Sequence, residues 1–269
     1  MNSRLLHISS MSAVGTAAVQ AAAWTASRRA GRANVADVAW GPGLAATATV
    51  SALLTGPGGL RRALMLAGAV GGWGARLALH VHRASADRGE DPRYAEMLDG
   101  DGPVVRVFKV FVTQGVAQWV VSCPMQVAAA TGRAPRGRAG RALEAVGWGM
   151  LLTGGAFEAV ADRQKSRWRS EPDHGPVMDR GLWAWSRHPN YFGDACFWWG
   201  VYLVCAASGP ARWTIWSPAL MSWTLVEGTG ARRAERMRAD DPDYAAYQRR
   251  VSFFLPRQPR AHETSRGAS

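Results

Sequence analysis

Apolar residues gather along the chain into runs of about 17 to 25, the length that a helix needs to cross a hydrocarbon core of about 30 Å. Short stretches rich in arginine separate these runs. The runs lie at about 5–26, 35–54, 63–82, 104–130, 143–161, 190–207 and 213–227. The pattern predicts an all-α, polytopic membrane protein with about seven transmembrane helices.

The domain organisation follows from the same pattern. The fourth run is long and contains Pro124, which predicts a kinked helix. We expect residues 1–256 to form a single integral membrane domain. Residues 257–269 are rich in Arg, Ser and Gly, so this stretch is expected to be a disordered tail.

Basic residues predict the orientation. Three alternate loops and the stretch 228–269 carry 20 lysines and arginines, whereas the segments expected on the opposite side carry 8. Cytoplasmic loops of membrane proteins are enriched in Lys and Arg. We therefore expect a multi-pass protein of the inner (plasma) membrane with a cytoplasmic C-terminus and an external N-terminus.

The charge of the whole chain raises one alternative. A formal net charge of +12 and a pI of about 10.8 would suit a nucleic-acid binder. The arginines flank apolar runs instead of covering one face of a polar domain, which favours the bilayer over nucleic acid as partner. The three cysteines, Cys123, Cys196 and Cys205, lie inside apolar runs without metal-binding spacing, so no metal site is predicted.

Three polar clusters fall on the predicted cytoplasmic side. In the first, Glu158, Asp162 and Lys165 are spaced so that they share one helix face at the end of the fifth run. Ionisable groups at this depth suggest function, although an interfacial stripe of ion pairs that only ends a helix is the alternative.

The second cluster is Arg187-His188-Pro189-Asn190-Tyr191, with Asp194 one turn further on. Pro189 suits the first turn of the following helix, whose free N–H groups and dipole favour an anion such as a cofactor phosphate. Arg187 is available for bidentate contact with that anion. Asn190 and Asp194 could bind an amide or ribose, or could simply cap the helix.

The third cluster contains Arg233 and Glu235, followed by Tyr244 and Tyr247. Its members lie on the same predicted side as the other two clusters. The half of the chain from about 143 to 256 is therefore expected to contain a cofactor site.

At these residues the chain resembles the DUF1295 membrane proteins, which are related to the C-terminal domain of steroid 5α-reductases. The matching stretches cover about residues 35–256: Val38–Gly43 after Asp37, Trp73–His80, Gly89–Tyr94, Phe157–Lys165, Gly181–Asp194 with Trp198–Gly200, and Tyr244–Pro256. More distantly, a His-Pro turn and a terminal Glu, Tyr, Tyr, Arg pattern also occur in sterol reductases and isoprenylcysteine methyltransferases.

The resemblance implies an NADPH-dependent reductase that acts on the carbon–carbon double bond of a steroid-like or other lipidic enone. Asp162, Arg169, Asn190, Tyr191 and Asp194 would line the NADPH site, with Arg187 nearby. The full expected set of cofactor-binding residues is Glu158, Asp162, Lys165, Arg169, Arg187, His188, Asn190, Tyr191, Asp194, Arg233, Glu235 and Tyr247.

Two earlier residues are the catalytic candidates. In the steroid enzymes a Glu and a Tyr polarise the substrate ketone, and Asp37 and His80 take their places here. A histidine tuned near neutral pH is the usual general acid, so this pair would protonate the substrate. A packing or interfacial histidine is the alternative for His80.

Two other functions remain open. The same motifs suit an S-adenosylmethionine-dependent methyltransferase acting on a lipid or lipidated substrate. A non-catalytic lipid-binding membrane protein is the third reading. The chain has no Gly-rich dinucleotide fingerprint after a strand, so any nucleotide would bind among helix ends.

Overall fold

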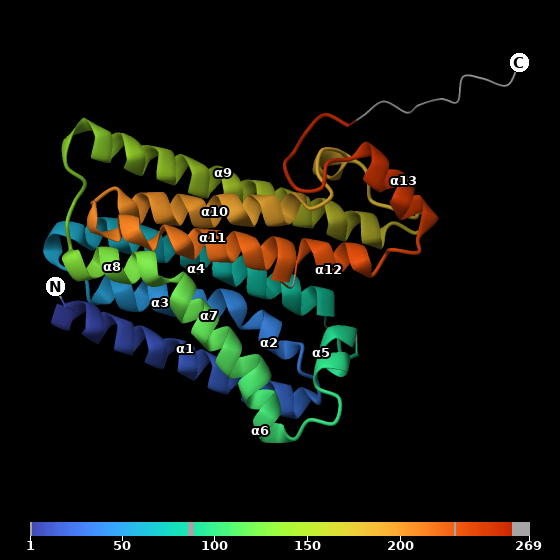
Figure 1. Cartoon of the computed structure of the whole chain (residues 1–269), viewed down its shortest axis with the longest axis horizontal. Helices are drawn as coiled ribbons and strands as arrows, with labels where there is room; N and C mark the ends of the chain where they lie inside the picture. Colours follow the sequence, from blue (N-terminus) through green and yellow to red (C-terminus); the bar gives the residue numbers. More distant parts are fainter. Residues whose placement is uncertain (1, 86–88, 229, 260–269) are drawn as a thin grey trace, which may run out of the picture. The chain divides into compact units, whose positions relative to one another are not determined.

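The computed structural model describes residues 2–85, 89–228 and 230–259, and over these residues the chain is helical without strands (Figure 1). Most residues of the predicted tail 257–269 lie outside the described residues. The long helices are α1 (Asn2–Ala30), α3 (Trp40–Leu53), α4 (Leu60–Ser85), α9 (Gly137–Ser170) and α10 (Pro189–Ala206). The all-α prediction is confirmed.

Shorter elements connect the long helices. They are α2 (Val35–Val38), η1 (Pro57–Gly59), α5 (Pro92–Met97), α6 (Pro103–Arg106), the π-helical η2 (Val107–Val112), α7 (Thr113–Val121), α8 (Cys123–Thr131), η3 (Gly181–Ala184), η4 (Pro210–Ile215), α11 (Trp216–Trp223), the π-helical η5 (Thr224–Gly228), α12 (Ala231–Arg236) and α13 (Pro242–Arg250). The kink predicted at Pro124 is a break between α7 and α8, where Pro124 occupies the first turn of α8.

Two helical segments of the described residues are long and apolar enough to cross a membrane: Pro57–Ser85 and Pro103–Val121. The other predicted spans form helices at the expected places, but some of these helices are short, with 14 residues in α3 and 8 in α11, and others are less apolar. α1 is rich in Ser, Thr and Ala, and α9 begins and ends with arginines. A seven-span arrangement therefore remains a proposal.

Packing divides the chain into two compact units. Unit 1 contains Met1–Val146 and Val201–Ser217, and unit 2 contains Gly147–Gly200 and Pro218–Ser269. Unit 2 resembles the predicted cofactor half at about 143–256, except that residues 201–217 pack with unit 1.

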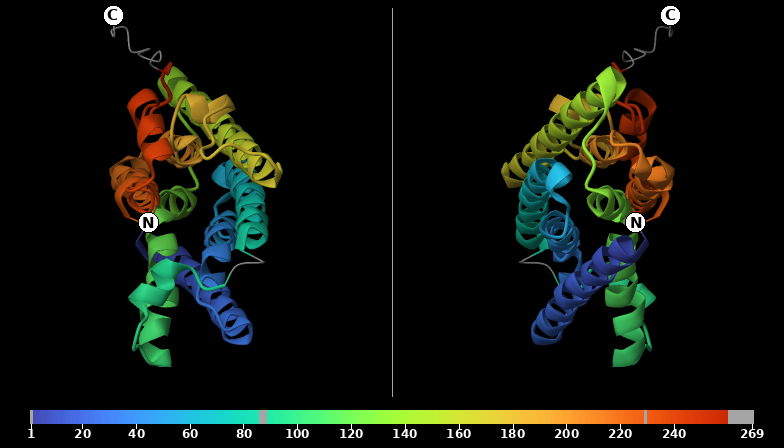
Figure 2. Two further views of the ribbon diagram at one scale, coloured as in Figure 1. Left: turned by 90° about the vertical axis from the view of Figure 1, so that its right-hand side faces the viewer. Right: turned by 90° about the vertical axis from the view of Figure 1, so that its left-hand side faces the viewer.

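In unit 1, α3 packs against both α1 and α4. A Cβ atom on Gly74 would lie 2.6 Å from the carbonyl oxygen of Gly41, so only glycine permits this approach of α3 and α4. α1 also crosses α7 (Figure 2). The crossing leaves an apolar groove between these two helices, which is described further below.

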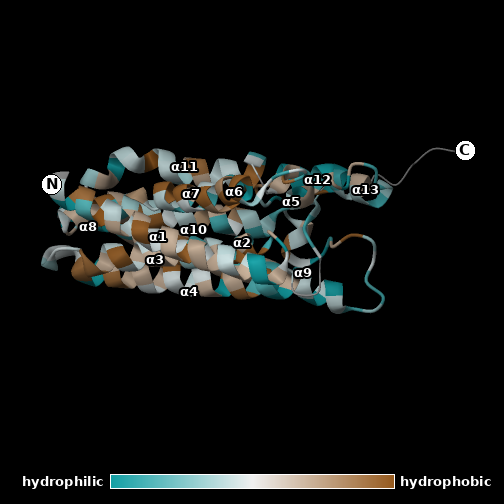
Figure 3. Ribbon diagram, turned by 90° about the horizontal axis from the view of Figure 1, so that it is seen from below, coloured by the Kyte–Doolittle hydropathy of each residue, from teal (hydrophilic) through white to brown (hydrophobic). Residues whose placement is uncertain are grey.

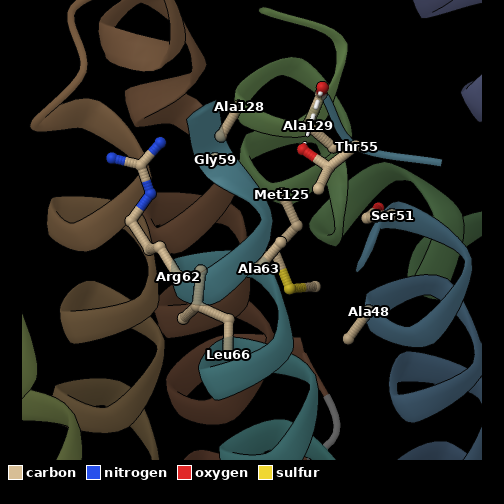
Figure 4. Close-up of a pocket in the computed structure, with 10 residues that line it drawn as sticks. All are labelled: Ala48, Ser51, Thr55, Gly59, Arg62, Ala63, Leu66, Met125, Ala128 and Ala129. Atoms are coloured by element: carbon tan, nitrogen blue, oxygen red, sulfur yellow. Dashed lines mark hydrogen bonds between the residues drawn. The ribbon is translucent and has the colours of Figure 1, made fainter. Parts of the chain in front are cut away.

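A small cavity remains where η1, α3, α4 and α8 meet (Figure 4). Thr55 Oγ1 donates to the Ala129 carbonyl at 3.2 Å beside it, and the guanidinium of Arg62 donates to the Arg133 carbonyl. Its volume of about 10 Å³ holds no more than one water molecule. This cavity is too small for a substrate.

In unit 2, α9 and α10 approach closely at glycines. A Cβ atom on Gly193 would lie 2.6 Å from the backbone nitrogen of Glu158 and 2.7 Å from the carbonyl oxygen of Gly154. This contact places the first turns of α10 alongside the part of α9 that holds Glu158 and Asp162. Hydrophilic residues dominate α12 and α13 (Figure 3), which complete the unit.

Candidate functional site

The predicted face of α9 is buried at its polar positions. Glu158 is 3% exposed and Asp162 is 6% exposed, whereas Lys165 is half-buried one turn later. Arg169, a further turn along, is exposed. These four residues share one face of α9, as their spacing predicts, and they form a stripe that runs from the interior of unit 2 to its surface.

Lys165 lies in a cationic and aromatic environment. Its Nζ is 4.0 Å from the ring centroid of Trp183 and 5.8 Å from that of Trp168. Among the described residues it forms no ion pair with a carboxylate. Burial and, to a smaller extent, the positive charges of Arg169 and Arg238 together lower the pKa of Lys165 to about 7.

The loop between α9 and α10 holds Trp183 in place. Gly181 has a φ of +61°, which favours glycine, and its position lets Leu182 N donate to Gln164 Oε1 at 2.9 Å. Trp183 Nε1 donates to the Ala161 carbonyl at 3.0 Å. These bonds fold the loop back along the end of α9 and set the indole beside Lys165.

Arg187 forms the centre of a second group. Its Nε and Nη2 donate to the two carboxylate oxygens of Glu235 at 2.6 and 3.2 Å. Its Nη1 donates to the carbonyls of Gln248 at 2.8 Å and Val251 at 3.0 Å. Both side chains of the pair are nearly buried, at 11% and 13% exposed.

These contacts differ from the expectation for Arg187. The sequence predicted a guanidinium free to bind a phosphate, but here the bidentate partner is Glu235 on α12. A buried charge is costly unless it is paired, and the carboxylate of Glu235 pairs with Arg187 here. Through its hydrogen bonds, Arg187 joins the start of α10 to α12 and to the end of α13.

His188 contacts the same carboxylate. Its Nε2 is 3.3 Å from Glu235 Oε1, and its ring stacks on that of Tyr191 at 5.8 Å. Burial lowers the pKa of His188 below its ordinary value of 6.5, although Glu235 opposes the shift. Burial alone would raise the pKa of Glu235, but the hydrogen bonds and charges of His188 and Arg187 hold it below the ordinary value. His188 is therefore neutral at neutral pH and Glu235 is ionised.

Tyr247 and the segment after α13 complete this part of the unit. Tyr247 is 2% exposed, and its hydroxyl donates to the Trp183 carbonyl at 2.6 Å. Segment 252–257 pairs with residues 185–187: Arg187 N donates to the Ser252 carbonyl and Arg257 N to the Trp185 carbonyl, each at 2.9 Å. These contacts make Tyr247 a support of the loop that carries Trp183.

The first turn of α10 presents polar atoms. Asn190 is half-buried, and among the described residues its buried Oδ1 has no hydrogen-bond partner. Asp194, one turn further, is 6% exposed. Arg233 on α12 is half-buried. The unpartnered amide oxygen of Asn190 remains able to accept a hydrogen bond from a ligand.

The two catalytic candidates lie in unit 1. Asp37 Oδ2 accepts from Arg93 Nη2 at 2.7 Å, and Asp37 Oδ1 accepts from the Tyr94 hydroxyl at 2.6 Å. Gln114 Nε2 donates to the same hydroxyl at 3.2 Å. His80 is half-buried on α4.

Burial raises the pKa of Tyr94, and the negative charge of Asp37 raises it further. The Tyr94 hydroxyl is the hydrogen-bond partner of Asp37 Oδ1, and the assignment of Asp37 and His80 as catalytic residues stays a prediction. The carboxyl group of Asp37 is thus held by two residues of the segment Gly89–Tyr94, Arg93 and Tyr94.

Sequence reasoning did not identify Trp168, Trp183, Arg238 or Gln248 as parts of the site. Trp183 lies in the stretch Gly181–Asp194, which contributes to the family resemblance, and its neighbour Lys165 is one of the expected cofactor-binding residues. No sequence pattern relates Arg238 to Lys165, because the two are brought together by tertiary packing alone.

Comparison with known proteins gives a family but no activity. The family model described as "Protein of unknown function (DUF1295)" matches residues 23–251. A relative, the "Uncharacterized protein C594.04c" of Schizosaccharomyces pombe, is 25% identical over 224 residues, and the match covers 71% of this chain. The match spans 62% of that relative's length. No solved structure matches. Because the family model covers most of the chain, including both groups of polar residues, the protein belongs to the DUF1295 family.

Proposed function

We propose that this protein is a membrane-embedded reductase that uses NADPH to reduce the carbon–carbon double bond of a steroid-like or other lipidic enone. The observation that carries the proposal is Lys165, a half-buried cation without a carboxylate partner in the described chain, beside Arg169 and Arg238. A half-buried ammonium group without a carboxylate partner favours an anionic ligand. A phosphorylated nucleotide supplies such an anion.

The other polar groups of unit 2 suit the rest of a nucleotide. The unpartnered Oδ1 of Asn190 can accept a hydrogen bond from an amide or a ribose hydroxyl. The Trp183 ring offers an aromatic face. When bound, NADPH supplies a hydride, and the residues of unit 2 orient and hold it. Arg187 and Glu235 support this arrangement through α12.

The length of α9 supports a membrane-embedded arrangement. Its 34 residues correspond to about 51 Å of helix, which exceeds a hydrocarbon core of about 30 Å. The end that carries Lys165 and Arg169 would then extend beyond the core into water. A cytoplasmic placement of this end, as the distribution of arginines predicts, would give the site access to the nucleotide pool.

Within this proposal the proton donor is Tyr94 or His80, and Asp37 supports Tyr94. The Tyr94 hydroxyl is bonded to Asp37, so it would have to turn toward a substrate carbonyl in order to donate. We expect Tyr94→Phe to lower single-turnover reduction by about 10²-fold to 10⁴-fold, with nucleotide affinity unchanged. The measurement is stopped-flow oxidation of NADPH with an accepted enone. His80→Ala is the parallel variant, and normal turnover by Tyr94→Phe would assign the donor to His80 or another group.

The nucleotide itself gives the direct test of the proposed function. Saturating NADPH should raise the melting temperature of detergent-purified protein, since a ligand at about one hundred times its Kd adds about 2.7 kcal/mol of stability. S-adenosylmethionine should have no effect. Stabilisation by S-adenosylmethionine alone would instead support a methyltransferase, and the absence of stabilisation by either compound would favour a non-catalytic lipid-binding protein.

A further inference from the structure

An apolar groove runs between α1 and the helical segment formed by η2 and α7, all within unit 1. Its volume of about 370 Å³ is within the range of small-molecule sites. It extends along α1 from Ala13 to Trp24, about 16 Å at the rise of an α-helix. The widened π-helical turn of η2 contributes Val107, Phe111 and Val112 to the wall.

The rim of the groove is exposed and apolar. Val112 is 41% exposed, Val116 is 52% exposed and Trp119 is 36% exposed. These residues belong to Pro103–Val121, one of the two segments able to cross a membrane. Near one end of the groove, Trp24 packs edge-on against Phe111 at 5.3 Å. If this segment crosses the membrane, a groove beside it is accessible to lipid.

Two polar side chains line this apolar groove, Thr16 and Gln20, and the Thr16 hydroxyl already donates to the Ala13 carbonyl at 2.9 Å. Gln20 is 5% exposed, and its Nε2 donates to Gln118 Oε1 at 3.1 Å. Gln118 Nε2 in turn donates to the carbonyls of Ala39 at 3.0 Å and Trp40 at 3.3 Å. Backbone carbonyls only accept hydrogen bonds, so they fix the orientation of Gln118 and, through it, that of Gln20.

This chain of amides leaves Gln20 Oε1 as a buried acceptor with no partner among the described residues. A hydrogen bond from a donor stabilises a buried acceptor. Carbonyl, ether and hydrocarbon groups carry no such donor, whereas a hydroxyl group carries one. We propose that the groove between α1 and α7 binds a lipid alcohol, with its apolar part along the helices and its hydroxyl donating to Gln20 Oε1. This site lies in unit 1 and does not depend on the nucleotide site.

The test uses the purified full chain without nucleotide and tritiated farnesol as the probe, in a scintillation proximity assay. Unlabelled farnesol should compete about two to ten times better than farnesyl methyl ether, because a neutral hydrogen bond contributes about 0.5–1.5 kcal/mol. In Gln20→Leu the two competitors should become equal. Equal competition in the unchanged protein, or no saturable binding, would overturn the proposal.

A pair of neighbouring variants locates the binding. Ala17 lines the groove and Ala18 does not, although both are exposed on the same turn of α1. Ala17→Phe should fill the groove and abolish farnesol binding, whereas Ala18→Phe should retain it. Because neither change touches the amide chain, misfolding does not account for a difference between them. Unchanged binding in Ala17→Phe would place the alcohol elsewhere and contradict the assignment.

Discussion

Replacing Lys165 by methionine is expected to weaken NADPH binding by about ten- to a hundredfold, the loss of one hydrogen bond to a charged group. The methionine keeps an apolar side chain of similar length and removes the ammonium that lies over the Trp183 ring. Titration by microscale thermophoresis in detergent measures the effect. Lys165→Arg should retain most of the affinity, since it retains the charge.

The pH dependence provides a second readout of the same variant. The pKa of Lys165 is about 7 in the folded protein, so the ammonium is lost as pH rises through this value. NADPH affinity should therefore fall between about pH 7 and 9, where the phosphates have already ionised. The lowered pKa of His188 keeps that ring neutral over this range, and Tyr244, whose pKa burial raises to about 12, stays protonated. Lys165→Met should abolish the slope.

Lysine chemistry supplies the control. The chain contains only one other lysine, Lys109, which is exposed and paired with Asp101 at 2.7 Å. At pH 7.5 limited acetic anhydride should modify Lys165 before Lys109, because the neutral amine is the nucleophile. NADPH should protect Lys165, and Lys109→Met should bind NADPH normally. Equal modification of both lysines, with no protection, would contradict the assigned environment and the anion site together.

Glu235→Ala is expected to lower the free energy of unfolding by about 3–5 kcal/mol, the cost of removing one partner from a buried ion pair. The change leaves the Arg187 guanidinium without its carboxylate and takes a hydrogen-bond partner from Gln248 Nε2, at 3.3 Å. Thermal and urea unfolding, followed by tryptophan fluorescence, measure the loss. The free energy of unfolding of Glu235→Gln should lie between that of Glu235→Ala and that of the unchanged protein.

A matched control comes from the ion pair of Glu171 and Arg180, whose side chains are 47% and 59% exposed. Glu171→Ala should change stability by less than about 1 kcal/mol. Acid should also destabilise the unchanged protein. The neutral form of His188 is favoured in the fold, so its contribution is lost below about pH 6.5, and that of ionised Glu235 is lost at lower pH. Equal losses in Glu235→Ala and Glu171→Ala would refute a structural role for the buried pair.

The helices could be predicted because their signal is local. Each apolar run specifies its own segment, and Pro124 interrupts the backbone hydrogen bonds at its own position. The short elements α12 and α13 were not resolved as helices from the sequence. They are short and polar, although the pair Asp241-Pro242 is a helix-start signal, and α13 begins where Asp241 accepts from Asp243 N and Tyr244 N at 3.1 Å.

The candidate residues could be named from the sequence, but their partners could not. Arg187 and Glu235 were both assigned to the cofactor, yet each is the other's partner across 48 residues. Asp37 and Tyr94 pair across 57 residues. A sequence pattern shows that a polar group is unusual at its position, whereas burial and pairing depend on which distant segment packs there.

The pairing of segment 252–257 with residues 185–187 has a consequence for biosynthesis. The loop that carries Trp183 is translated some seventy residues before Ser252, Phe254 and Arg257, whose backbones hold it. While the ribosome is still adding α12 and α13, Arg187 lacks both Glu235 and its two carbonyl acceptors. In the nascent chain Arg187 therefore lacks these protein partners until this late segment emerges, and the proposed nucleotide site can form only after residue 257 has left the exit tunnel.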